Sequence, residues 1–301
     1  MPQNKRQPTH TGSLPAHVVR NAGKMKKKQC AIVTLVLGQK IADTFRVHFY
    51  PGWREYADRH DLGLVVVNCG LDASPRGLSR SPAWQKLLVH NVPEARAFER
   101  LAWVDADVMI RPDAPNIFTA VPEGKVGAVD DFATPTEVDH DLVMRELYRR
   151  WDRQGVKYIS NRTATEYYAN YGIECHLTSV VQTGVLVYEP LTHGPLFENV
   201  YSTYEEGAHC SLNHEMRPLS YELLKAQAVH WLDPKFNMQW SYWRELHYPF
   251  LGEGDPRPFG ALFGSRSDER LRRRCVMTAL RNNYFIHFAG RSRDYLLLDR
   301  R

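Results

Sequence analysis

The chain has 301 residues, of which 43% are hydrophobic and 24% are charged. This composition is that of an ordinary globular protein, and it excludes a fibrous or wholly disordered chain. The five cysteines are widely separated, with no CxxC pair and no Cys/His spacing of a zinc site. We therefore expect reduced thiols, a cytoplasmic location and no disulfide scaffold.

The net charge of +5 raises the question of a nucleic-acid or lipid partner. The basic residues gather near the two ends of the chain, at Lys5, Arg6, Arg20, Lys24, Lys26, Lys27 and Lys28, and at Arg270, Arg272, Arg273, Arg274 and Arg281. We interpret these ends as solvated, with peripheral contact to an anionic membrane surface or contact with an anionic substrate as the alternatives. Aromatic and basic residues do not interleave as a stacking platform requires, so we expect no nucleic-acid partner.

In chain order, residues 1–28 have no apolar period and predict a disordered basic tail. Lys26 to Lys28 followed by the apolar run 31–37 imitates the start of a signal peptide. That run is short, however, and leads into Gln39 and Lys40 rather than a small-residue cleavage site, so we interpret it as the first strand. No other stretch approaches the roughly 18 apolar residues of a membrane span.

Strand and helix patterns then alternate. We predict strands over 31–37, 64–67, 101–104 and 125–129, with helices over 41–59, where Pro51-Gly52 must interrupt or restart the helix, and over 82–90. The second half is less regular, with predicted helices over 141–154 and 221–228 and strands over 180–188, 229–232 and 284–288. The alternation predicts an α/β fold with a Rossmann-like, mostly parallel central sheet flanked by helices, and ligands at the carboxyl ends of the strands. Neither GxGxxG nor GxxxxGK[ST] occurs, which argues against a dinucleotide dehydrogenase or a P-loop enzyme.

Two acids, Asp105 and Asp107, directly follow a buried-looking strand. On an extended chain their side chains would point to the same side, about 7 Å apart. Such a pair can share Mn²⁺ or Mg²⁺, and phosphate oxygens usually complete the coordination. An ordinary strand-to-loop turn, where Asp is common, is the alternative.

His287 ends the last predicted strand and precedes Gly290, Arg291 and Arg293. An imidazole is a good ligand for Mn²⁺, and the two arginines could meet the charge of a diphosphate. The alternative is a structural histidine with its hydrogen bonds satisfied.

The order of several short motifs resembles the A-type fold of the nucleotide-diphospho-sugar glycosyltransferases. The likeness is to the retaining branch that contains glycogenin, bacterial lipopolysaccharide galactosyltransferases, yeast mannosyltransferases and plant xylosyltransferases. It spans about residues 30–290 and rests on Thr34, Trp84-Gln85-Lys86, Arg100 to Ile110 with Asp-Ala-Asp, Gln182-Thr183-Gly184-Val185-Leu186-Val187, Asp233-Pro234-Lys235-Phe236-Asn237 and Ile286-His287-Phe288-Ala289-Gly290.

The resemblance implies a role for each matched residue. Asp105, Asp107 and His287 would bind Mn²⁺ or Mg²⁺. The other matches would contact the donor: Thr34 and Leu35 the nucleotide base, Lys86 the diphosphate or donor sugar, Asp130 the sugar hydroxyls, Gln182, Gly184 and Asn237 the donor pocket, and Gly290 and Arg291 the diphosphate. Each has a plain alternative as a strand, loop or surface residue.

The sequence departs from the family pattern at two places. Asn213-His214-Glu215 stands where many relatives carry Asp-Gln, which makes Glu215 a candidate nucleophile or base and Glu222 its rival. The Lys-Pro-Trp that often follows the terminal histidine is absent, which leaves Arg291 and Arg293 to neutralise phosphate.

The resemblance thus implies a single glycosyltransferase domain over 29–301, with a nucleotide-binding half at 29–135 and an acceptor-binding and metal-completing half at 136–301. It would transfer a hexosyl or pentosyl group from a UDP- or GDP-sugar to a glycan, lipid, peptide or small-molecule hydroxyl, with retention. The alternatives are an inactive sugar-nucleotide or glycan-binding module, and a nucleotidyltransferase. A nucleotidyltransferase would need a glycine- and arginine-rich loop after the first strand, and Gly38-Gln39-Lys40 is too short to be one. An irregular C-terminal region would hold the acceptor. Its aromatic residues would either stack against the acceptor, as the wall of its binding site, or pack in the core. They are Trp231, Phe236, Trp240, Tyr242, Trp243, Tyr248 and Phe250.

Overall fold

The computed structural model describes residues 29–155, 161–206, 214–251, 265–290 and 293–298, with the side chains of 265–268 excepted. The predicted tail, residues 1–28, lies outside the described residues, as do Asn213 and Arg291. No helix within the described ranges is long and apolar enough to cross a membrane.

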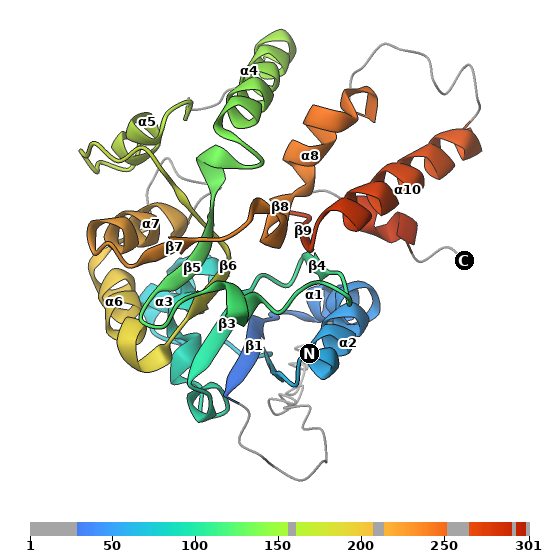
Figure 1. The fold of residues 1–301 in the computed structure, drawn as a ribbon. Coiled ribbons are helices and arrows are strands. Elements are labelled where there is room, and N and C mark those ends of the chain that lie inside the picture. The colour runs from blue at the N-terminus through green and yellow to red at the C-terminus, as the bar shows by residue number, and fades with distance from the viewer. Residues whose placement is uncertain (1–28, 156–160, 207–213, 252–264, 291–292, 299–301) are drawn as a thin grey trace, which may run out of the picture.

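A six-stranded sheet forms the centre of the molecule (Figure 1). Its strand order is β2-β1-β3-β6-β5-β7. The strands are β1 (Cys30–Leu35), β2 (Gly63–Val67), β3 (Arg100–Val104), β5 (Val126–Asp130), β6 (Val181–Tyr188) and β7 (Val229–Trp231). Five strands run in one direction and only β6 is antiparallel to its neighbours, so the predicted mostly parallel α/β sheet is confirmed.

The reversed direction of β6 decides which of its residues can reach a ligand. Ligands of an open α/β sheet bind at the carboxyl ends of the parallel strands. β6 is antiparallel to β3, and Val104 lies opposite Val185 while Leu101 lies opposite Tyr188. The first residues of β6 therefore lie beside the carboxyl end of β3, at the edge of the sheet where ligands bind. The Asp105 amide continues the pairing by donating to the Gly184 carbonyl at 2.8 Å.

A second, three-stranded sheet brings the end of the chain beside the acids. Its order is β4-β9-β8, and its strands are β4 (Val108–Ile110), β8 (Met238–Gln239) and β9 (Phe285–His287). Val108 pairs with His287 across β4 and β9, and Gln239 pairs with His287 across β8 and β9. The Phe288 amide also donates to the Asp107 carbonyl at 3.0 Å. The sequence predicted β9 but not β4 or β8.

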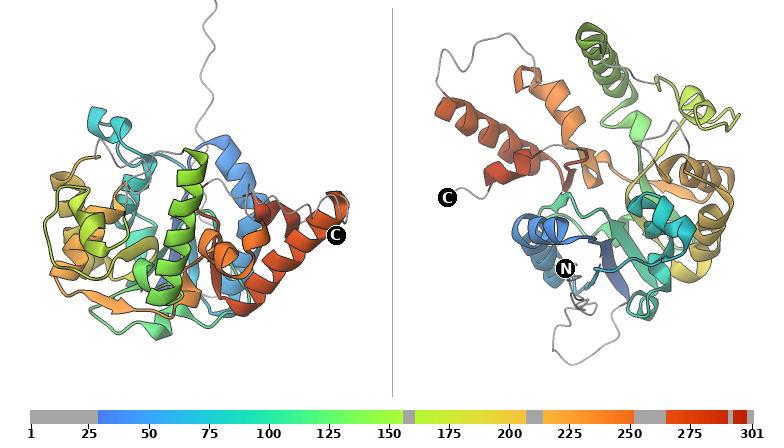
Figure 2. Two further views of the ribbon diagram at one scale, coloured as in Figure 1. Left: turned by 90° about the horizontal axis from the view of Figure 1, so that it is seen from above. Right: turned by 180° about the vertical axis from the view of Figure 1, so that it is seen from behind.

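The main sheet is buried on both faces, which explains its nearly continuous apolar strands. Ile32 packs into one hydrophobic cluster, whereas its neighbours Ala31 and Val33 pack into another. Figure 1 shows α1 and α2 on one side of the sheet and α6 and α7 on the other, and Figure 2 shows the same arrangement from behind. The helices are α1 (Gln39–Thr44), α2 (Tyr50–Arg59), α3 (Pro75–Ser79), α4 (Glu137–Gln154), α5 (Ala164–Ala169), α6 (Pro190–Thr203), α7 (Met216–Lys225), α8 (Trp240–His247) and α10 (Ser265–Asn282).

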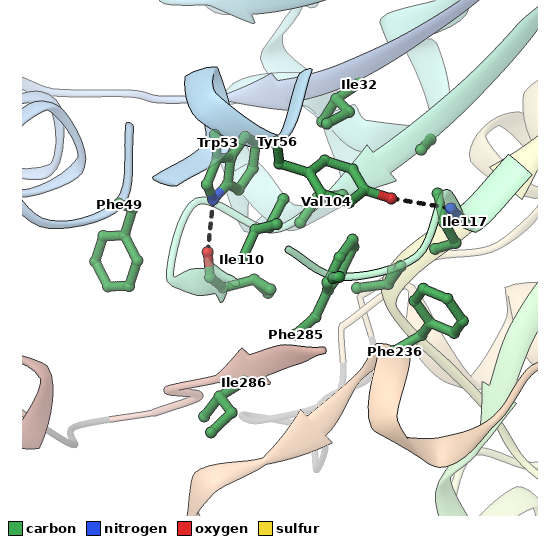
Figure 3. Packing of buried hydrophobic residues seen from close by; sticks show 14 of the residues in the cluster. Ile32, Phe49, Trp53, Tyr56, Val104, Ile110, Ile117, Phe236, Phe285 and Ile286 are labelled. Carbon is green, nitrogen blue, oxygen red and sulfur yellow. Dashed lines mark hydrogen bonds between the residues drawn. The ribbon is translucent and has the colours of Figure 1, made fainter. Parts of the chain in front are cut away.

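A π-helical turn, Phe45–Phe49, joins α1 to α2, so Pro51 restarts a helix rather than breaking one. Proline is tolerated in the first helical turn, where its missing N–H needs no partner. The rest of α2 packs against β4 and against the segment that follows β4 in the chain. The Trp53 Nε1–H donates to the Val108 carbonyl at 2.7 Å, and the Tyr56 hydroxyl accepts from the Ile117 amide at 2.9 Å (Figure 3).

Three predicted helices have different bounds or geometry. The segment 82–91 is a 3-10 helix, which begins where the Ser81 hydroxyl accepts from the Ala83 amide. The α4 helix starts at Glu137 rather than 141, because the Thr136 hydroxyl caps it by accepting from the Asp139 amide. The α7 helix lies five residues earlier at its start than predicted, at Met216 instead of 221.

A buried ion pair ties α4 to α8. The two guanidinium nitrogens of Arg150 contact the two carboxylate oxygens of Glu245 at 2.9 and 2.5 Å. The Glu245 side chain is 1% exposed, and Arg244 contacts it at 3.2 Å. Such a two-point arginine–carboxylate contact fixes orientation as well as distance.

Candidate functional site

Asp105 and Asp107 lie in a turn after β3 and not on an extended chain, so the predicted backbone geometry is wrong. The Val108 amide closes this turn by donating to the Asp105 carbonyl at 3.0 Å. The turn nevertheless brings the side chains together. One ligand atom from each of Asp105, Asp107 and His287 lies within 4.8 Å of the others.

His287 forms the buried back of this group. Its Nε2 atom lies 3.1 Å from Asp107 Oδ1 and 3.7 Å from Asp105 Oδ2. The histidine side chain is 6% exposed, whereas those of Asp105 and Asp107 are 26% and 43% exposed. The two carboxylates are therefore partly exposed to solvent, whereas the imidazole lies buried behind them.

Charge attraction within the group outweighs the effect of burial. Burial alone would raise the pKa of Asp107, but attraction to His287 and the hydrogen bond between them lower it. Burial likewise would lower the pKa of His287, yet Asp107 and Asp105 raise it. Both effects favour the charged forms of the acid and the imidazole.

Gln182, Gly184 and Asn237, which we expected to line a donor pocket, contact His287 or one another. Asn237 Oδ1 lies 3.2 Å from His287 Nδ1, and Asn237 Nδ2 donates to Gln182 Oε1 at 3.2 Å. The Gly184 amide donates to the same Gln182 oxygen at 2.6 Å. All three positions come together at the beginning of β6 and just before β8, behind the imidazole ring.

Lys86 joins Asp105 to Glu215. Its ammonium lies 3.2 Å from Asp105 Oδ1 and 2.8 Å from Glu215 Oε1. The Thr183 hydroxyl donates to the same Glu215 oxygen at 2.9 Å. Burial opposes the charged form of Lys86, but the two carboxylates outweigh it and raise the pKa of the ammonium.

The two glutamates that the sequence left as rivals have different surroundings. Glu215 is 2% exposed and lies beside the acidic turn through Lys86. Glu222 instead accepts from the Tyr204 hydroxyl at 2.6 Å and lies 3.7 Å from Lys225. Glu215 is thus the one connected to the Asp-Asp-His group.

Asp130 ends β5 as predicted, but its carboxylate is used in the turn that follows. Asp130 Oδ1 accepts from the amides of Phe132 and Val180 at 3.0 and 3.1 Å. Burial raises its pKa above the usual value. Asp130 therefore supports the local backbone, and nothing in its described contacts joins it to Asp105 or His287.

Asp131 was not among the site residues that the sequence predicted, but of the two neighbouring acids Asp130 and Asp131 it is the one that is buried. It is 7% exposed, and Asp131 Oδ1 accepts from Gln239 Nε2 at 2.6 Å. Gln239 in turn pairs with His287 in the small sheet. Burial, and then the charge of Asp130, raise the pKa of Asp131 to about 7. Two successive acids at a strand end were the only sequence signal for it.

Among the described residues, the remaining predicted donor contacts form no side-chain hydrogen bond or ion pair with Asp105, Asp107 or His287. Thr34 and Leu35 end β1, and the buried Thr34 hydroxyl has no hydrogen-bond partner among the described residues. Gly290 follows β9 with a φ of 78°, a conformation that favours glycine. Arg293 is exposed, and Arg291 is outside the described residues.

The aromatic residues proposed as an acceptor wall divide between core and surface. Phe236 and Trp240 are 4% and 0% exposed and belong to the hydrophobic core, so core packing accounts for them. Trp231, at the end of the edge strand β7, is 40% exposed. Tyr242 packs against His140 with ring centroids 5.4 Å apart.

Comparison with known proteins supports the fold. No protein-family model and no curated protein matches the sequence. The solved structure of the galactosyltransferase LgtC, in complex with donor and acceptor sugar analogues, is 13% identical with a TM-score of 0.50, and the match covers 89% of this chain and 92% of LgtC. A glycosyltransferase involved in glycosylation of the major capsid of PBCV-1 is 13% identical with a TM-score of 0.48, and the match covers 89% of this chain and 98% of that one. At this identity the likeness to LgtC concerns the fold alone, and the chain has the A-type glycosyltransferase fold that its sequence predicted.

Proposed function

We propose that the chain is a glycosyltransferase that uses Mn²⁺ or Mg²⁺ to transfer a sugar from a UDP- or GDP-sugar to an acceptor hydroxyl, with retention. The observation that carries this proposal is the convergence of Asp105, Asp107 and His287 at the ligand edge of the sheet. The A-type fold makes a nucleotide-sugar donor the natural partner of such a group.

The three side chains fit one hard cation. Ligand atoms about 2.1 Å from a six-coordinate ion stand roughly 3–4 Å apart. The distances from His287 Nε2 to Asp107 Oδ1 and Asp105 Oδ2 are 3.1 and 3.7 Å. Two carboxylates suit Mg²⁺ and Mn²⁺, and the added imidazole favours Mn²⁺. The exposed side of the two acids leaves room for phosphate oxygens.

In the proposed reaction, the chain supplies two kinds of group. Asp105, Asp107 and His287 hold the cation, which when bound acts as a Lewis acid toward the leaving diphosphate. Lys86, at 3.2 Å from Asp105, adds a fixed positive charge on the same side.

Glu215 supplies the carboxylate on the sugar side of the proposed site. The Lys86 ammonium and the Thr183 hydroxyl both contact its Oε1 atom, at 2.8 and 2.9 Å, and so fix its position. We assign it to the positive charge that develops at the anomeric carbon, as nucleophile or as electrostatic partner.

The test is donor binding by Asp107→Asn. This change keeps the size of a side chain that lies in a surface turn but removes the charge that holds the cation. We expect calorimetric titration with UDP- and GDP-sugars to show Mn²⁺-dependent binding by the wild type and a loss of at least about tenfold in the variant. The matched control is Asp113→Asn, whose carboxylate contacts Arg111 outside the site. Equal donor affinity in Asp107→Asn and the wild type would remove the acids from the function.

A further inference from the structure

We propose that Gln182, Gly184 and Asn237 are positioning residues that hold the His287 ring so that its Nε2 atom faces Asp105 and Asp107. This inference rests on the proposed function, since it concerns how the chain prepares a cation ligand. It reassigns three residues that the sequence resemblance linked to the donor pocket.

A series of hydrogen bonds links the backbone of β6 to the ring through Gln182 and Asn237. Gln182 Oε1 accepts from the Gly184 amide at 2.6 Å and from Asn237 Nδ2 at 3.2 Å. Because the Gln182 oxygen takes up the Asn237 NH₂ group, the other amide atom, Oδ1, is turned toward His287 Nδ1 at 3.2 Å. An amide oxygen can only accept, so the proton of this hydrogen bond belongs to Nδ1.

A proton fixed on Nδ1 determines what the other ring nitrogen can do. In a neutral imidazole with Nδ1 protonated, Nε2 carries the lone pair that a metal ligand needs. That atom is the one 3.1 Å from Asp107 Oδ1. Gln182, Asn237 and His287 are 7%, 0% and 5% exposed, so bulk water cannot readily exchange for these contacts.

Gly184 provides the space for the ring. A Cβ atom at this position would lie 2.5 Å from His287 Cε1 and 2.6 Å from His287 Nδ1. Glycine inside a strand weakens it and often marks the close approach of another group. In β6, whose other residues are all larger and buried, the approaching group is the His287 imidazole.

The first experiment measures Mn²⁺ affinity directly, by electron paramagnetic resonance of free Mn²⁺ without any donor. Asn237→Leu keeps a similar volume but removes the oxygen that accepts from Nδ1, and Gln182→Leu removes the oxygen that orients Asn237. We expect each to weaken Mn²⁺ binding by about 10- to 100-fold, the usual effect of losing a partner of a metal-ligating histidine.

The matched control is Asn283→Leu. Asn283 is also fully buried, but its side-chain amide donates to the Ala279 carbonyl in α10, and none of its described contacts joins it to Asp105, Asp107 or His287. It should lower thermal stability and leave Mn²⁺ affinity within about twofold of the wild type. Mn²⁺ affinity within about twofold of the wild type in Asn237→Leu would overturn the inference. A wild type that binds no Mn²⁺ would instead overturn the proposed metal-dependent function.

The second experiment tests the ring contact without metal, and so decides the inference if Asn237→Leu does not fold. Gly184→Ala should reduce the folding equilibrium constant at least about fivefold in urea titrations, because the methyl group overlaps the imidazole. In the His287→Ala background the same change should have less than about a twofold effect, since the ring is gone. An equal loss in both backgrounds would show that Gly184 does not make room for His287, and would refute the proposal.

Discussion

The buried carboxyl of Asp131 should make the stability of this protein depend on pH. Its pKa is raised from the usual 3.8 to about 7 by burial and then by the charge of Asp130. The folded protein therefore binds this proton more tightly than the unfolded chain does. The stabilising contribution is complete below about pH 4 and is lost as the pH rises through about 7. At 1.36 kcal/mol for each pKa unit, the difference corresponds to about 4 kcal/mol.

The variant Asp131→Asn isolates this contribution. Its amide oxygen can still accept from Gln239, which lies 2.6 Å from Asp131 Oδ1, but the side chain cannot ionise. We expect the free energy of unfolding of the variant, relative to the wild type, to rise by about 2–4 kcal/mol between pH 4 and pH 8. Urea unfolding at both pH values measures it, with Asp113→Asn as an exposed control. A difference between variant and wild type that does not change with pH would refute the reasoning.

Four further variants test buried packing and buried charge by urea unfolding, and the variant of Lys86 also by donor binding. Glu245→Gln should cost about 3–5 kcal/mol because it removes the negative charge from the buried ion pair with Arg150, whereas the double variant Arg150→Met/Glu245→Leu should cost less. An equal or larger cost in the double variant would contradict this. Trp240→Ala should cost about 3–5 kcal/mol, since this side chain is fully buried, and a loss under 1 kcal/mol would contradict its place in the core. Lys86→Met should both destabilise the fold and weaken donor binding, because it removes the ammonium group that forms an ion pair with the buried Glu215. Unchanged donor affinity would remove Lys86 from the proposed site.

The main sheet could be predicted because its strands are buried on both faces. For example, β1 (Cys30–Leu35) sends Ile32 to one hydrophobic cluster and Ala31 and Val33 to the other, so nearly every residue of the strand must be apolar. The same reasoning located Asp105 and Asp107, since acids directly after such a strand fall at the ligand edge of the sheet.

The second sheet could not be predicted in the same way. The apolar run 284–288 predicted β9, but β4 has three residues and β8 has two, which is too short to show a period of alternating side chains. Pairing over long sequence separations, such as that of Val108 with His287, leaves no local signal. The geometry around His287 therefore depends on tertiary contacts.

The reversed β6 and the buried Asp131 were missed for related reasons. An apolar strand has the same composition whether it runs parallel or antiparallel to its neighbours, so the run 181–188 does not reveal its direction. Asp130 and Asp131 are adjacent acids, and only the path of the folded chain decides which of the two is buried. Here the turn uses Asp130 Oδ1 for the backbone amides and leaves Asp131 to face Gln239.

Donor turnover tests metal-dependent sugar transfer from a nucleotide sugar most directly. Purified protein is incubated with a panel of UDP- and GDP-sugars and Mn²⁺, with and without EDTA, and release of nucleoside diphosphate is measured. We predict that at least one donor is hydrolysed or transferred only when Mn²⁺ is present, and that Asp107→Asn abolishes this release. Release that is unaffected by EDTA, or no release from any donor, would contradict the claim.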